Sequence, residues 1–206
     1  MKLLLTSSGI NSKRLRNEFV RLTNNILETK VLVAHTAQKP EHYIFVHQVG
    51  QELAKAGILH PNIYYFNMID QNNTPELENY NVVYICGGNT YLILDRMRKT
   101  GLANALYEFV RRGGIYVGVS AGSIIAGKSI EIAGWGSEPD SNNINLRDLN
   151  GLGFTEIAVF PHYKNSLRNE IKEFRRKVNY PIETIKDKEA ILIDEKEIRK
   201  IKLAKI

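Results

Sequence analysis

The sequence has very little cysteine and no long apolar run, and each absence excludes a class of protein. Cys86 is the only cysteine among the 206 residues, so an internal disulfide is impossible and a disulfide-stapled secreted domain is excluded. No apolar run approaches the roughly 20 residues of a membrane-spanning helix. Residues 1–7 carry too short an apolar stretch for a signal peptide and look like a first strand. We therefore expect a cytoplasmic protein that does not insert into a membrane.

The usual cofactor motifs are also missing. There is no HExxH pattern, no cysteine pair and no tight cluster of histidines with acids, so no metal site is indicated. A Walker loop and a GxGxxG fingerprint are absent too. The net charge is +6, but basic and acidic residues are interspersed and no basic patch carries interleaved aromatics. We expect no cofactor, no metal and no nucleic-acid partner.

What is present is a regular alternation of apolar strands and amphipathic helices. The expected strands are 2–6, 31–37, 63–69, 82–86, 115–119, 154–160, 182–185, 190–193 and 198–203. The expected helices are 12–27, with Ser12 as N-cap, then 41–56, 90–97, 103–112, 121–126 and 166–178. This alternation predicts one α/β domain over residues 1–206, with a doubly wound, mostly parallel sheet and helices on both faces. The last three short strands are predicted to form a C-terminal hairpin unit.

The most informative motif is GVSAG at 118–122, a GxSxG pattern between an expected strand and an expected helix. A serine in such a sharp turn has its hydroxyl exposed at the sheet edge. The glycines allow the strained backbone and the close approach of neighbouring chain. The motif makes an enzyme with Ser120 as nucleophile the leading hypothesis.

A serine nucleophile needs a base, and the base needs an orienting acid. His162 follows an expected strand and should lie at the carboxyl edge of the sheet, where Ser120 also lies; His35 is the alternative base. Asp187 ends the next expected strand and is the first candidate for the acid. Glu189, Glu138 and Asp140 stay open as alternatives to it.

The stretch GGNT at 87–90 lies between an expected strand and an expected helix. Its backbone N–H groups point outward at a helix start. In a hydrolase this turn would supply one oxyanion donor and the N–H of Ala121 the other. Cys86, inside the strand, is interpreted as a small buried hydrophobe.

Three motifs, YICGGNT at 84–90, GVSAG at 118–122 and FPHY at 160–163, together resemble the serine peptidase family of aspartyl dipeptidase (peptidase E) and cyanophycinase. The likeness runs from about residue 2 to residue 192. It implies a fold similar to class I glutamine amidotransferases, which is flavodoxin-like, with serine in place of their cysteine. It also implies that Ser120 is the nucleophile and His162 the base. Asp187 stands where aspartyl dipeptidase has a glutamate, and Gly88 joins Ala121 in the oxyanion hole.

The resemblance leaves the substrate side chain open. Aspartyl dipeptidase reads an N-terminal aspartate with residues in and around the loop after the serine turn. The corresponding loop here, 129–150, is polar and turn-rich and does not match. The candidate substrate-binding residues are Asn89, Trp135, Glu138 and Asp140.

The sequence thus predicts a serine peptidase of the peptidase E type that cleaves short peptides, dipeptides first among them, through an acyl-enzyme. Two alternatives stay open. One is an amidase or esterase with the same catalytic residues, and the other is a non-catalytic binding module that retains the turn. The expected partner is a small peptide substrate, and a homodimer is a further expectation.

Overall fold

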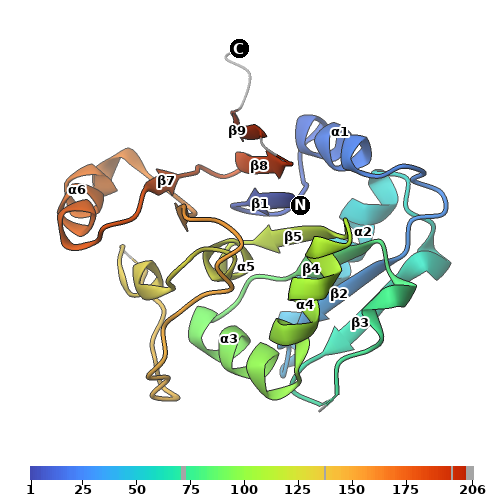
Figure 1. Ribbon diagram of the computed structural model, residues 1–206, viewed down its shortest axis with the longest axis horizontal. Helices are drawn as coiled ribbons and strands as arrows, with labels where there is room; N and C mark the ends of the chain where they lie inside the picture. Colours follow the sequence, from blue (N-terminus) through green and yellow to red (C-terminus); the bar gives the residue numbers. More distant parts are fainter. Residues whose placement is uncertain (71–72, 137, 196, 203–206) are drawn as a thin grey trace.

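The structure is a computed structural model that describes residues 1–70, 73–136, 138–195 and 197–202. Within these residues the centre is a seven-stranded sheet in the order β3-β2-β4-β5-β1-β8-β9 (Figure 1). Strands β3 to β1 in this order pair in parallel, whereas β8 pairs antiparallel with β1 and β9 pairs antiparallel with β8. The strands are β1 (Lys2–Thr6), β2 (Val31–His35), β3 (Ile63–Asn67), β4 (Val82–Ile85), β5 (Ile115–Val119), β8 (Ala190–Asp194) and β9 (Glu197–Ile201).

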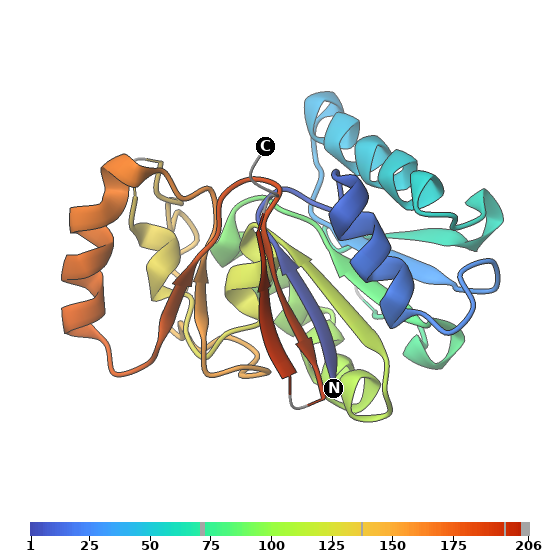
Figure 2. The same cartoon turned by 90° about the horizontal axis from the view of Figure 1, so that it is seen from above.

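Helices cover both faces of this sheet, which confirms the predicted fold class. They are α1 (Lys13–Leu22), α2 (Pro40–Lys55), α3 (Thr90–Lys99), α4 (Leu102–Arg111), α5 (Ala121–Ile125) and α6 (Arg168–Lys177). Helices α1 and α2 lie together on one side in the view from above (Figure 2), where their apolar residues join Leu4 and Val33 in one core cluster. Helices α3, α4 and α5 join Leu3 and Leu5 in a second cluster on the other face.

The residues of β1 show why the sheet has two cores. Leu3, Leu4 and Leu5 are all fully buried, and successive side chains on a strand point to opposite faces. A continuous apolar run therefore requires cover on both sides, as in parallel sheets of α/β proteins. Among the described helices none is long and apolar enough to cross a membrane.

A second, smaller sheet stands beside the main one. It pairs β6 (Ala158–Phe160) with β7 (Ile182–Thr184) in parallel, and α6 connects the two strands at one end of the molecule (Figure 1). The prediction that 182–185 belongs to the C-terminal hairpin is therefore wrong, because β7 pairs with β6 rather than with β8. The hairpin itself, β8 with β9 against β1, is confirmed.

Several predicted elements are longer than the observed ones; the strands predicted for 31–37 and 63–69, for example, end at His35 and Asn67. The helix predicted for 12–27 ends at Leu22 and is capped by Thr23, because the asparagines that follow favour turns over helix. The strand predicted for 154–160 pairs only over 158–160. The helix N-cap at Ser12 is confirmed by its hydroxyl, which accepts from the N–H of Leu15 at 3.2 Å. The end of the strand predicted for 198–203 lies outside the described residues.

Gly118 gives a first testable prediction. A Cβ at this position would lie 2.6 Å from the carbonyl carbon and oxygen of Gly122, and both are backbone atoms that cannot swing away. We expect Gly118→Ala to destabilise the fold by at least about 2 kcal/mol, which lowers Tm by roughly 4–8 °C in a chain of this size. The measurement is thermal unfolding followed by circular dichroism.

Gly101→Ala is the matched control for this prediction. Gly101 has a φ of +84° but no atom within 4 Å of the added Cβ. Only backbone strain of about 1 kcal/mol is expected there. Equal stability of the two variants would contradict the argument from the clash at Gly118.

Candidate active site

Ser120 lies in a strained turn between β5 and α5. Its φ is +50° and its ψ is −108°, values that a residue with a side chain rarely adopts. Its N–H donates to the carbonyl oxygen of Thr6 at 3.0 Å, so the end of β1 fixes the turn. Such strain is typical of functional sites, and the turn matches the one predicted from the GxSxG pattern.

His162 and Asp187 reach Ser120 from the small sheet. Nε2 of His162 lies 3.0 Å from Oγ of Ser120, and Nδ1 lies 2.8 Å from Oδ1 of Asp187. An ionised carboxylate can only accept, so Nδ1 carries the hydrogen and Nε2 is left to accept from the serine hydroxyl. His162 also has a positive φ, +53°. The structure therefore brings the three sequence-predicted residues into one hydrogen-bonded chain.

Ser7 is part of this cluster and was missed by the sequence analysis. It follows directly after β1 and is fully buried. Its hydroxyl donates to Oδ1 of Asp187 at 2.9 Å and accepts from the N–H of His162 at 2.8 Å. The sequence gives only a weak indication of this role, since Ser7 is a hydroxyl residue just after a buried strand and many serines occupy such positions.

The surroundings of Asp187 favour its ionised form. Partial burial acts to raise the pKa of the carboxyl group, but hydrogen bonds from His162 and Ser7, with the charges of His162 and Lys164, outweigh it and lower the pKa. Asp187 is therefore a carboxylate at neutral pH. A carboxylate beside Nδ1 fixes the tautomer of the imidazole and stabilises its protonated form.

The two backbone N–H groups predicted as oxyanion donors lie beside Ser120. Ala121 is the first residue of α5, so its N–H has no partner within the helix. Gly88 follows β4 with a φ of +144°. Its neighbour Gly87 approaches Ser120 so closely that an added Cβ would lie 3.3 Å from the serine Cβ. In the part of the chain that the structure describes, no group accepts a hydrogen bond from the N–H of Gly88.

A cavity of about 140 Å³ opens next to the serine. Its walls mix apolar side chains with two carboxylates and one ammonium group. The lining residues are Gly88, Thr90, Ser120, Ile124, Ile132, Ala133, Trp135, Gly136, Glu138, Asp140, Phe160, Pro161, His162, Lys164 and Leu167. An apolar pocket with a few polar groups beside a nucleophile is the usual form of a substrate site.

Three of the four predicted substrate-binding residues, Trp135, Glu138 and Asp140, line this cavity. Asp140 also accepts from the N–H of Thr90 at 2.8 Å. Asn89 is not among the lining residues, and its side chain is used within the fold. Its Oδ1 caps α3 by accepting from Leu92, and its Nδ2 donates to the carbonyl of Ser141 at 2.9 Å. These contacts hold the long loop 129–150 against the start of α3.

The loop is also anchored on its other side. Trp135 packs against Phe174 of α6 with ring centroids 4.9 Å apart, and the ammonium of Lys177 lies 4.5 Å from the centre of the indole. The N–H of Gly136 donates to Glu170 at 2.7 Å. The long loop is therefore a packed wall of the cavity, attached to α3 and to α6.

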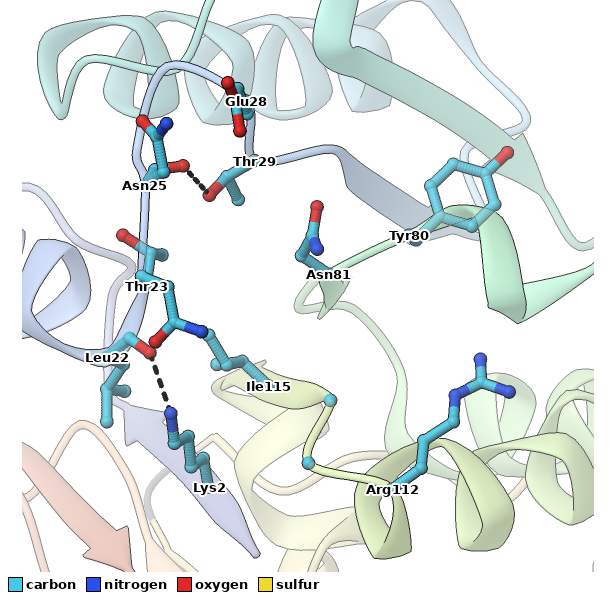
Figure 3. A pocket seen from close by; sticks show the side chains of 13 residues that line it. Lys2, Leu22, Thr23, Asn25, Glu28, Thr29, Tyr80, Asn81, Arg112 and Ile115 are labelled. Carbon is cyan, nitrogen blue, oxygen red and sulfur yellow. Dashed lines mark hydrogen bonds between the residues drawn. The ribbon is translucent and has the colours of Figure 1, made fainter.

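A larger hollow, about 320 Å³, lies at the opposite, amino edge of the sheet (Figure 3). Its lining includes no serine, cysteine or histidine. The two basic side chains in its lining already have partners within the protein. Lys2 donates to the carbonyl of Leu22 at 3.2 Å, and Arg112 forms an ion pair with Glu78 at 2.6 Å. Ligands of open α/β sheets bind at the carboxyl edge, so the smaller cavity beside Ser120 is the candidate site.

The alternative site residues lie elsewhere. His35 is buried; its Nδ1 accepts from the N–H of Ala37 at 3.2 Å, and its ring packs on Tyr43. Glu189 accepts from the N–H of Lys186 at 2.9 Å. Burial, with the nearby carboxylate of Glu52, raises the pKa of Cys86 to about 12, so its thiol stays protonated. Over the described ranges, no three His, Cys, Asp or Glu side chains gather as a metal site requires.

The chain resembles known peptidases over most of its length. The model of Peptidase family S51 matches residues 3–201. An uncharacterized peptidase of Listeria monocytogenes is 28% identical over 205 residues, which cover 95% of this chain and 96% of that protein. Peptidase E of Escherichia coli is 30% identical over 91 residues, which cover 44% of this chain and 38% of that protein.

Solved structures agree with these sequence matches. The crystal structure of a protein provisionally named Peptidase E from Listeria monocytogenes EGD-e has a TM-score of 0.76 and 25% identity, with 98% of each chain covered. A peptidase from an acI-B1 Actinobacterium has a TM-score of 0.66 at 19% identity, over 93% of this chain and 82% of that one. The second likeness is one of fold alone.

Proposed function

Since the chain belongs to peptidase family S51 and is a serine peptidase of the peptidase E type, we propose that it hydrolyses dipeptides with Ser120 as nucleophile, His162 as base and Asp187 as orienting acid. The observation that carries the proposal is the continuous hydrogen-bonded chain, 3.0 Å from serine to imidazole and 2.8 Å from imidazole to carboxylate. Both distances are within the reach that proton transfer requires.

Each residue then has one task in the reaction. Ser120 attacks the substrate carbonyl while Nε2 of His162 takes the hydroxyl proton. The imidazolium formed in this step is stabilised by the Asp187 carboxylate. His162 then gives the proton to the leaving amine, and water hydrolyses the acyl-enzyme with His162 again acting as base.

The oxyanion of the tetrahedral intermediate needs donors that are already oriented. The N–H groups of Gly88 and Ala121 flank Ser120 from the turn after β4 and from the start of α5. We assign both to this role. Their position follows from β4 and β5, neighbouring strands whose carboxyl ends meet at one edge.

The cavity supports a dipeptide as the substrate. A volume of about 140 Å³ compares with the roughly 150 Å³ of a protein cavity that holds one benzene, so there is room for one residue rather than for a long chain. Glu138 and Asp140 on its wall suit a free α-ammonium group. Lys164, also on the wall, suits a carboxylate.

The substrate proposal is tested by comparing free and N-acetylated dipeptides in a mass-spectrometric assay. We expect kcat/KM to be about tenfold lower for the acetylated forms, a loss of about 1.4 kcal/mol, because acetylation removes the charge that pairs with the cavity carboxylates. Glu138 is exposed, so a larger effect is not expected from it.

Simple esters and amides in the same assay separate the other functions. Cleavage of esters or amides with no cleavage of any dipeptide would replace the peptidase proposal with an esterase or amidase. A fluorophosphonate probe that fails to label Ser120 in the folded protein, together with no turnover, would indicate a binding module.

A further inference from the structure

Ser7 contacts both partners of the proposed nucleophile from a position that substrate does not reach. Its side chain is fully buried and it is not among the residues that line the cavity. The hydroxyl lies 2.9 Å from Oδ1 of Asp187, 2.8 Å from the backbone nitrogen of His162 and 3.3 Å from Nδ1 of the same histidine.

The hydrogen-bonding capacity of a hydroxyl group fixes the direction of these contacts. A serine hydroxyl has one hydrogen to donate and two lone pairs to accept with. The ionised Asp187 can only accept, so it receives the hydrogen, and a lone pair accepts the N–H of His162. The same oxygen therefore restrains the carboxylate and the backbone of the histidine.

Ser7 does more than accept one buried N–H group, because it lies where the main sheet meets the residues of the small sheet. His162 follows β6 and Asp187 follows β7, both strands of the small sheet, whereas Ser120 follows β5 of the main sheet. Ser7 follows directly after β1 of the main sheet. The residue before it, Thr6, accepts the N–H of Ser120 at 3.0 Å. The carbonyl of the last residue of β1 thus holds Ser120, and the hydroxyl of the residue after it holds His162 and Asp187.

We propose that Ser7 is a positioning residue, which holds Asp187 at hydrogen-bonding distance from His162, and His162 at hydrogen-bonding distance from Ser120, during turnover. This inference rests on the proposed function of those three residues. It assigns no proton transfer to Ser7, because its hydrogen is already given to Asp187 and its oxygen does not face the cavity.

The test is the variant Ser7→Ala. Its kcat is expected to fall about 10-fold to 100-fold, because misplacement of a catalytic group by about 1 Å costs up to that factor. Its KM should change less than about twofold, since no cavity contact is lost. The hydrogen bond from Ser7 is one cause of the lowered pKa of Asp187, so the midpoint of Asp187 titration, followed by carboxyl ¹³C NMR, should move to higher pH.

Three variants control this experiment. Ser12→Ala also loses a partly buried hydrogen bond, the cap of α1, but should leave kcat and the Asp187 midpoint unchanged. Ser7→Thr keeps the hydroxyl and should restore the midpoint. Ser7→Cys, a weaker donor of similar size, should give an intermediate shift and carries the test should the alanine variant not fold.

The results that would overturn the role of Ser7 differ from those that would overturn the proposed function. An unchanged kcat in Ser7→Ala, or a lower kcat with an unmoved Asp187 midpoint, would overturn the positioning role while Ser120→Ala remains inactive. Activity in Ser120→Ala would instead overturn the proposed function.

Discussion

Ser120→Ala is expected to lower kcat for the best dipeptide by roughly 10⁶-fold, as loss of a serine nucleophile does when base and acid remain. The fold should persist, because within the described residues the Ser120 hydroxyl is hydrogen-bonded to the His162 side chain alone. The measurement is dipeptide hydrolysis with purified protein, together with thermal unfolding to compare the two folds.

Ser123→Ala is the matched control for the loss of a serine in the same turn. Ser123 is fully buried in α5, and its hydroxyl lies 2.8 Å from the carbonyl oxygens of both Thr6 and Gly118, which share its one hydrogen. Its loss should lower stability and change kcat by less than about tenfold, since about 1 kcal/mol is the usual net value of one hydrogen bond. Substantial turnover by Ser120→Ala would contradict the proposed mechanism, because Ser120 is the residue whose hydroxyl lies 3.0 Å from Nε2 of His162.

The second large effect is expected for Asp187→Asn, with a fall in kcat of about 10⁴-fold. An amide at this position can donate to Nδ1 of His162, and the imidazole would then hold its hydrogen on Nε2, where it cannot accept the serine proton. The fold should be little affected, since Asp187 is exposed. The measurement is kcat at saturating dipeptide across a range of pH.

Glu189→Gln controls for the loss of a neighbouring charge. Its carboxylate accepts from the N–H of Lys186 at 2.9 Å, and within the described chain it makes no hydrogen bond to His162. A change of no more than about threefold in kcat is expected, as for most substitutions outside a site. A loss near 10⁴-fold in Glu189→Gln or Glu138→Gln, with Asp187→Asn still active, would assign the acid to another residue.

The sheet was predictable because its strands are buried on both faces. The bounds of β1 and β5 are those expected from the apolar runs alone. The place of β7 was not predictable in this way. Its three residues are compatible with pairing to either β6 or β8, and the choice depends on α6, which crosses between parallel strands as such connections must.

The residues of the candidate site were predictable where the sequence showed the end of a strand. Ser120, His162 and Asp187 each follow a strand, and parallel strands that end at one edge bring such residues together. Asn89 and Ser7 show what this reasoning misses. The amide of Asn89 is used to cap α3, and the hydroxyl of Ser7 acquires its partners only through chain more than 150 residues away.

The central position of β1 makes the site sensitive to the spacing of residues in its first strand. The end of β1 places the carbonyl of Thr6 against the N–H of Ser120 and, one residue later, the hydroxyl of Ser7 against Asp187 and His162. Removing a single residue between positions 2 and 6 would either shift Thr6 and Ser7 away from these partners or turn the buried leucines of the strand to the opposite faces of the sheet. β1 is paired along its whole length to β5 and to β8, so neither neighbouring strand could shift to compensate. Homologous enzymes that share this arrangement should therefore tolerate insertions in their loops far better than insertions or deletions in β1.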